Sequence, residues 1–227
     1  MWNLWRQRKA SADDTQKELL RSRERGALSA WDNLEALMSR ERHQNLQAQI
    51  AEIQAALRRQ QRPFRTHESI GVFMEQFSGR HFGKWARFRF LVLVGPSVQG
   101  KTSKAMSLYP EQTLKVCCGT CPDGILPSIA AFDWLKHRAI VFDEARPDQV
   151  LRNREVFQAN QHTQTLGQSA CNAFSYQVYL YHRALILCAN AWDLSASSIS
   201  ESDREWLEAN QILVSLPPGQ RWYEDSA

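Results

Sequence analysis

The stretch FRFLVLVGPSVQGKT, residues 88–102, decides the fold of this chain. Its first half, residues 88–94, is an apolar and β-branched run with the length of a strand. Such a run predicts a central parallel strand that is covered on both faces. Its second half fits the pattern G-x-x-x-x-G-K-[ST] and stands where a strand meets a helix. In this pattern glycines let the loop curl, so backbone N–H groups and the helix N-terminus point at phosphate groups.

We therefore predict that this loop binds the phosphates of ATP. Lys101 would reach the β and γ phosphates, and Thr102 would ligate Mg²⁺. The predicted ATP-binding residues are Gly95, Pro96, Ser97, Val98, Gln99, Gly100, Lys101 and Thr102.

Further apolar runs complete the sheet. The residues after Thr102 favour a helix to about Leu108, and strands are predicted at TLKVCC (113–118), HRAIVFDE (137–144) and RALILCAN (183–190). The fold class is therefore α/β: a P-loop NTPase with a mostly parallel central sheet covered by helices, plus an N-terminal helical arm. Ligands of such a sheet bind at the carboxyl ends of its strands.

Polar residues stand at those ends. Asp143 is predicted to hold Mg²⁺ together with Thr102, and Glu144 to polarise the attacking water. Asn190 ends a third buried strand, where its amide would contact the γ-phosphate or the water. A GTPase is less well supported, because Asn190-Ala191-Trp192-Asp193 lacks the lysine of the N-K-x-D element and Asp143 has no glycine three residues later.

Residues 1–66 are predicted to form a basic helical arm, and residues 67–227 the P-loop domain. The chain of 227 residues carries a net charge of +4, but residues 1–66 hold 13 basic and 8 acidic side chains. The arm is thus the part that would attract nucleic acid. Its apolar stripe has coiled-coil spacing, although an amphipathic helix packed on its own domain fits as well. The stripe consists of Leu34, Leu37, Leu46, Ile50, Ile53 and Leu57.

The segment HESIGVFMEQF after Thr66, a candidate N-cap, predicts a short helix that docks on the core.

Five cysteines, an odd number, favour a reducing compartment, and we expect an intracellular protein, nuclear or cytoplasmic. No apolar run has membrane-spanning length. Cys118 and Cys121 are spaced like half a zinc site, but no second pair follows, so ordinary thiols are the simpler interpretation.

The order of these motifs resembles that of superfamily 3 helicases, particularly the ATPase half of replication-initiator proteins of small circular single-stranded DNA viruses. The resemblance covers roughly residues 87–214 and implies a homo-oligomer in which an arginine from a neighbouring subunit completes the ATP site. Arg204 is the candidate, with Arg146 and Arg183 as alternatives. The family's N-terminal nuclease is not expected, because residues 1–66 contain one histidine and no tyrosine.

The family grips DNA with a basic hairpin between the strands that end at Asp143 and Asn190. Here that stretch contains QHTQTLGQSACNAFSYQVYLYHR, which predicts a β-hairpin but has no lysine. We expect an ATPase of the superfamily 3 helicase type that acts on single-stranded or duplex nucleic acid. The alternative is a P-loop ATPase without unwinding activity that serves as a nucleotide-switched assembly or interaction module. A small-molecule kinase is disfavoured, because residues 155–203 hold no arginine-rich lid.

Overall fold

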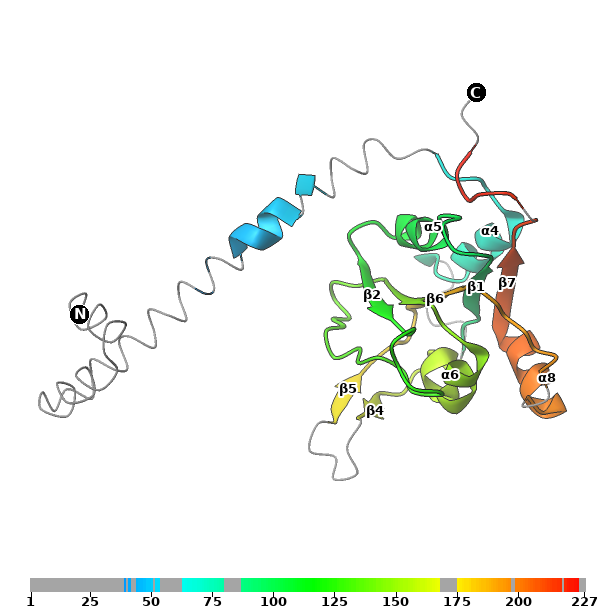
Figure 1. Cartoon of the computed structure of the whole chain (residues 1–227). Coiled ribbons are helices and arrows are strands. Elements are labelled where there is room, and N and C mark those ends of the chain that lie inside the picture. The colour runs from blue at the N-terminus through cyan, green and yellow to red at the C-terminus, as the bar shows by residue number, and fades with distance from the viewer. Residues whose placement is uncertain are drawn as a thin grey trace, which may run out of the picture. The chain divides into compact units, whose positions relative to one another are not determined.

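The computed structural model in Figure 1 describes residues 39, 41, 44–50, 52–53, 63–79, 87–167, 175–196, 199–217 and 219–224. The chain divides into two compact units, Met1–Gln61 and Arg62–Ala227. The second unit therefore includes residues 62–66, which the sequence prediction assigned to the arm. Within the described part, no helix has the length and apolar character needed to cross a bilayer.

The described residues of the first unit are helical. Leu46, Ile50 and Ile53 lie at the predicted coiled-coil spacing, and their exposed fractions are 52%, 36% and 60%. Leu34, Leu37 and Leu57 lie outside the described residues. Pairing of this stripe with another helix stays a prediction.

The second unit is built on a five-stranded sheet in the order β2-β3-β6-β1-β7. Each neighbouring pair is parallel. The predicted α/β class is therefore confirmed, and all the runs expected to be strands form them. The strands are β1 (Phe90–Val94), β2 (Thr113–Cys117), β3 (Ala139–Asp143), β6 (Ala184–Ala189) and β7 (Gln211–Ser215).

The three inner strands form the centre of the core. Every residue of β6 is buried, as are the first four residues of β1 and of β3. A strand that is buried along its whole length is covered on both faces, which explains why these sequences are continuous apolar runs instead of alternating ones. The outer strands β2 and β7 contain exposed residues.

The described part of this unit contains five helices. They are α4 (Glu68–Glu75), α5 (Lys101–Leu108), α6 (Pro147–Arg152), α7 (Arg154–Gln158) and α8 (Glu201–Asn210). Helix α4 contacts β7 and β1 and buries Ile70 and Phe73, so the prediction that it docks on the core is confirmed. The predicted N-cap at Thr66 was wrong by one residue. The cap is His67, whose backbone is extended and whose Nδ1 accepts a hydrogen bond from the backbone N–H of Ser69 at 3.3 Å.

The predicted hairpin is present as the antiparallel pair β4 (Gln164–Leu166) and β5 (Tyr176–Val178). It precedes the start of β6, and in Figure 1 it lies below the sheet, whereas α5 lies above it. The hairpin and the phosphate loop are therefore at opposite edges of the sheet. Residues 168–174, between the two strands, are outside the described part.

Candidate nucleotide site

The connections of the sheet diverge at β1 and β6. From β1 the chain runs through α5 to β2 on one side, and from β6 it runs through α8 to β7 on the other. Ligands of open parallel sheets bind at such a switch point, beyond the carboxyl ends of the strands. The loop 95–100 follows β1 at this edge and Asn190 follows β6, so the topology brings two distant motifs together.

The loop between β1 and α5 turns tightly, with three residues at positive φ. Gly95 and Gly100 have φ angles of 154° and 88°, and Val98 at the loop's apex has a φ of 68° and is 90% exposed. Gly100 is the left-handed N-cap of α5. A side chain at Gly100 would be strained by this backbone, and its Cβ would lie 2.5 Å from the ring of Tyr223.

Lys101 is buried and points back across the loop. Its ammonium donates hydrogen bonds to the carbonyl oxygens of Gly95 (2.6 Å) and Pro96 (2.8 Å) and to Oδ1 of Asn190 (3.1 Å). Ser97 Oγ also donates to Asn190 Oδ1, at 3.4 Å. Burial lowers the pKa of Lys101, and the charges of Asp143 and Glu144 counteract that effect. The structure thus brings together the cation at the start of α5 and the amide that follows β6.

Asp143 lies beside them, at the end of β3. Its Oδ1 accepts a hydrogen bond from the hydroxyl of Thr102 at 2.7 Å, and its Oδ2 is paired with the ammonium of Lys115 at 2.9 Å. A hydroxyl and a carboxylate are hard oxygen ligands of the kind that Mg²⁺ prefers. The pair Thr102 and Asp143 therefore fits the predicted Mg²⁺, and these two residues would hold the ion, which would supply positive charge next to the phosphates.

Glu144 is held in a conformation that a side-chain-bearing residue seldom adopts. Its φ is 57°, in the left-handed region, and its side chain is exposed. The Sγ of Cys117 lies 3.7 Å from Glu144 Oε2, and a Cβ at Gly119 would lie 1.9 Å from the same oxygen. Left-handed non-glycine residues concentrate at functional sites, where the surrounding structure compensates their strain.

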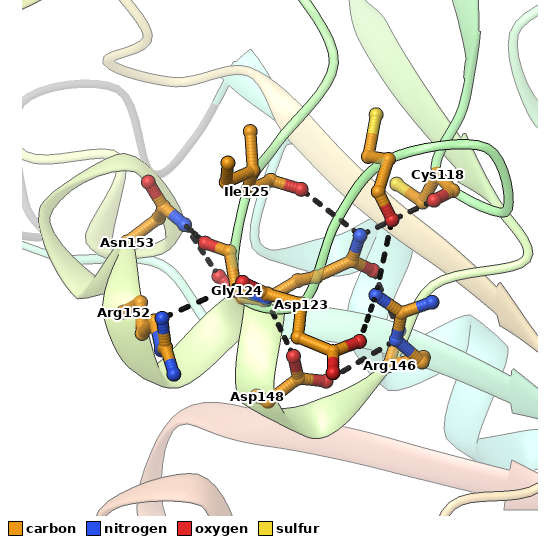
Figure 2. A network of polar contacts seen from close by, with 10 residues as sticks. Cys118, Asp123, Gly124, Ile125, Arg146, Asp148, Arg152 and Asn153 are labelled. Carbon is orange, nitrogen blue, oxygen red and sulfur yellow. Dashed lines mark hydrogen bonds and ion pairs between the residues drawn. The ribbon is translucent and has the colours of Figure 1, made fainter. Parts of the chain in front are cut away.

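A network of polar contacts joins the loop after β2 to Arg146 and α6 (Figure 2). Gln149, fully buried in α6, donates from Nε2 to the carbonyl oxygens of Cys118 (3.3 Å) and Ile125 (3.0 Å). Its Oε1 accepts from the backbone N–H of Arg146 at 3.0 Å. This one amide therefore ties the loop after β2 to the turn that follows Glu144.

Side chains of Arg146 and α6 complete that network. The backbone N–H of Gly124 donates to Asp148 Oδ2 at 2.6 Å, and Asn153 Nδ2 donates to Gly124 O at 2.9 Å. Arg146 is paired with Asp123 at 3.1 Å. These contacts tie loop 118–125 to α6, and the loop forms a wall beside Glu144, whose carboxylate lies next to Gly119.

The other side of the phosphate loop is closed by a two-segment clasp, which we define as residues 63–65 and 222–224. Phe64 and Tyr223 form an antiparallel bridge and stack with ring centroids 4.9 Å apart. Trp222 is fully buried, and its backbone N–H donates to Gln99 O in the loop at 2.9 Å. The ammonium of Lys104 in α5 donates to Arg65 O at 3.1 Å. The clasp thus contacts both the loop and its helix.

Each of the three candidate arginines has partners other than Lys101, Asp143 and Asn190. Arg204 of α8 donates to Leu194 O at 3.0 Å and is paired with Glu201 at 2.7 Å. Arg183 is buried at the start of β6, with its guanidinium 3.9 Å from the ring centroid of Trp134. Burial at that edge leaves Arg183 unsuited to reach a neighbour's phosphates, and Arg146 belongs to the network of Figure 2.

The cysteines near the site are thiols in the structure. Burial raises the pKa of Cys118 and of Cys188 to about 12, so both stay protonated at neutral pH. Among the described residues, no group of three or more His, Cys, Asp or Glu side chains is placed to hold a metal ion. Cys171 is outside the described residues.

Several residues of the site were missed by sequence reasoning. Lys115 and Gly119 carry no motif, and Gln149 lies in a helix that the sequence analysis did not anticipate. Trp222 was the clearest available signal, because a tryptophan stands out in a polar C-terminal segment.

Comparison with known proteins gives little beyond the fold. No family model matches the chain, and no curated protein does. Among solved structures, the chain is similar to one titled "S. cerevisiae Hsp104-ADP complex", with a TM-score of 0.37 and 12% identity, over 65% of this chain and 32% of that one. We draw no functional conclusion from a likeness this distant.

Proposed function

We propose that residues 62–227 form a Mg²⁺-dependent ATPase of the superfamily 3 helicase type that acts on nucleic acid. One observation supports the ATPase part of the proposal. The ammonium of Lys101 donates a hydrogen bond to Oδ1 of Asn190, and the hydroxyl of Thr102, the next residue, donates one to Oδ1 of Asp143. The start of α5, the last residue of β3 and the residue after β6 are thus in contact, which supports a shared role toward phosphate. Asn190 lies against the phosphate loop, which favours a role toward the γ-phosphate over the reading of a guanine base.

In this proposal Lys101 and the loop's N–H groups bind the β and γ phosphates, and Glu144 accepts a proton from the attacking water. The water oxygen bonds to the γ-phosphorus as the bond to the bridging oxygen breaks, which yields ADP and phosphate. The left-handed backbone of Glu144 and the wall of loop 118–125 would orient its carboxylate.

The experiment is ATP hydrolysis by the whole chain, with and without single-stranded DNA or RNA. Lys101→Ala should abolish tight ATP binding. Glu144→Gln should keep binding but lower turnover roughly 10²- to 10⁴-fold, the usual contribution of a general base. Absence of ATP binding by the unaltered protein would refute the proposal at its root.

The nucleic-acid part is tested on the hairpin. Thr165 and Gln177 are exposed and face each other across β4 and β5. Changing either to Glu adds a negative charge that would repel phosphates, so stimulation by nucleic acid should fall while basal turnover stays unchanged. Gln112→Glu, at an exposed position outside the hairpin, is the matched control.

A nucleotide-switched assembly module is the second candidate. The observation that favours it is the hairpin's composition, because residues 161–182 contain no lysine or arginine. Hydrolysis that ignores DNA and RNA, and that is equal in the hairpin variants, would select this function over strand separation.

Oligomerisation and the role of Arg204 can be tested by mixing two inactive variants. Lys101→Ala subunits retain Arg204, whereas Arg204→Ala subunits retain an intact phosphate loop. If the arginine acts on a neighbour's ATP, the mixture should recover activity, since such an arginine contributes roughly 10³-fold or more to the rate. No recovery, together with a fully active Arg204→Ala protein, would remove Arg204 from the site.

A further inference from the structure

Lys115 reaches the site from a strand with no recognised motif. It lies on the edge strand β2, where its Cα is paired with Val141 of β3, and its side chain extends toward the strand end. There its ammonium lies 2.9 Å from Oδ2 of Asp143. The Lys115 side chain is 47% exposed and that of Asp143 is 19% exposed. The carboxylate is therefore fixed in the fold, whereas the long lysine stem retains access to solvent.

The two lysines of the site have different partners. Lys101 donates to three neutral oxygen atoms, two carbonyls and one amide. Lys115 instead forms an ion pair with Asp143, while Thr102 occupies the other oxygen of that carboxylate. The charge of Asp143 is therefore balanced directly by Lys115.

We propose that Lys115 is a positioning residue that neutralises Asp143 when nucleotide binds without metal, and so sets how strongly binding depends on Mg²⁺. This inference rests on the proposed ATP site. The triphosphate of ATP is highly anionic, so an unpaired carboxylate beside it opposes binding. Either Lys115 or Mg²⁺ removes that repulsion, and a half-exposed lysine can leave when the metal takes its place.

The proposal predicts a difference between two binding constants. Affinity for the non-hydrolysable analogue AMP-PNP is measured by calorimetry with excess Mg²⁺ and again with EDTA. Lys115→Gln should weaken binding in EDTA about three- to fivefold, the effect of one partly exposed ion pair, and change binding in Mg²⁺ less. In Lys115→Gln, the dissociation constant in EDTA divided by that in Mg²⁺ should therefore be larger than in the unaltered protein. This increase should be smaller at high salt.

Two matched variants separate this role from a general effect of charge or folding. Lys115→Arg keeps the cation and should retain the ratio of the unaltered protein. Lys136→Gln removes the same charge at an exposed position away from Asp143 and should also leave the ratio unchanged. Circular dichroism during heating checks that each variant is folded.

Each outcome decides the point. A ratio in Lys115→Gln equal to that of the unaltered protein, whether or not both constants shift together, overturns the inference while leaving the ATP site intact. If the unaltered protein binds no AMP-PNP in either buffer, the proposed function itself fails. A raised ratio that Lys115→Arg does not show supports the assignment.

Discussion

The two edges of the central sheet differ in how firmly the fold holds them. At the carboxyl edge, residues from β1, β3, β6 and α5 hydrogen-bond one another, and the clasp and loop 118–125 flank them. At the opposite edge, the hairpin consists of two three-residue strands. It is joined to the body through contacts such as that between Tyr176 Oη and the N–H of Ile129, at 2.9 Å.

The proposed phosphate site is therefore organised by more contacts than the proposed contact surface for nucleic acid. The carboxyl edge concentrates charge and backbone strain at Lys101, Asp143 and Glu144. Among the described residues of the hairpin strands, none is a lysine, arginine, aspartate or glutamate. Variants at each edge, and at the clasp that belongs to the first, test how far this contrast holds.

The largest effect is expected at the clasp. Trp222→Ala empties a fully buried site, so the free energy of unfolding should fall by about 3–5 kcal/mol, as for other large-to-small changes in cores. Urea denaturation followed by circular dichroism measures it. Arg221→Ala, at the exposed neighbouring position, should cost little. A loss below about 1 kcal/mol for Trp222→Ala would show that the clasp does not support the loop.

The next effect concerns Asp143 and its hydroxyl partner. Thr102→Val keeps the shape of the side chain but removes the donor to Asp143 Oδ1 and a proposed Mg²⁺ ligand. We expect AMP-PNP binding in Mg²⁺ to weaken roughly 10- to 100-fold, the range seen when a metal's supporting ligands are removed. Calorimetry measures it, with Ser103→Ala as the adjacent control. Unchanged affinity would exclude Thr102 from the metal site.

A smaller effect is expected at the hairpin. Tyr176→Phe removes the oxygen that accepts from the N–H of Ile129, a residue that is 1% exposed. The loss of unfolding free energy should be about 1 kcal/mol, the typical value of one such hydrogen bond, and AMP-PNP affinity should not change. Tyr179→Phe serves as the comparison. A drop in AMP-PNP affinity would mean that the hairpin and the carboxyl edge of the sheet are coupled, which would contradict this prediction.

A final effect, of similar size, is a pH dependence at the hairpin edge. His182 is buried beside Phe77 and Phe88, and burial, aided by Arg183 and Arg138, lowers its pKa below the ordinary 6.5. The unfolded chain therefore takes up the proton first as pH falls, and the free energy of unfolding decreases below about pH 6.5. One such proton contributes at most about 1.4 kcal/mol per pH unit. His182→Gln should flatten the curve measured between pH 7.5 and 5.5, and an identical slope would contradict the assignment.

The parts of the fold that depend on local patterns were predictable. Buried strands require continuous apolar runs, and the phosphate loop requires glycines at set positions, so β1, β3, β6 and loop 95–102 were found from sequence. Asp143, Glu144 and Asn190 followed because strand ends of a parallel sheet share one edge. Even a near miss was local: His67 caps α4 in place of its neighbour Thr66.

The remaining features come from contacts between distant residues, which leave no periodicity to read. The ion pair of Lys115 with Asp143 depends on the register between β2 and β3. The clasp joins residues 158 positions apart in the chain. Helices α6 and α7 were not anticipated, because they have only six and five residues and meet at Asn153. In such cases packing, not local sequence preference, determines the structure.

The clasp also brings the two ends of the second unit to one place. The N–H of Glu224 donates to Pro63 O at 2.8 Å, so the chain enters and leaves the unit side by side. A force that separates these ends would peel the clasp apart before it loaded the parallel sheet. After the clasp, the next hydrogen bond to carry this force would be the one between the backbone N–H of Trp222 and Gln99 O. Mechanical tension on the arm and a ligand in the proposed phosphate loop would therefore act on the same few atoms.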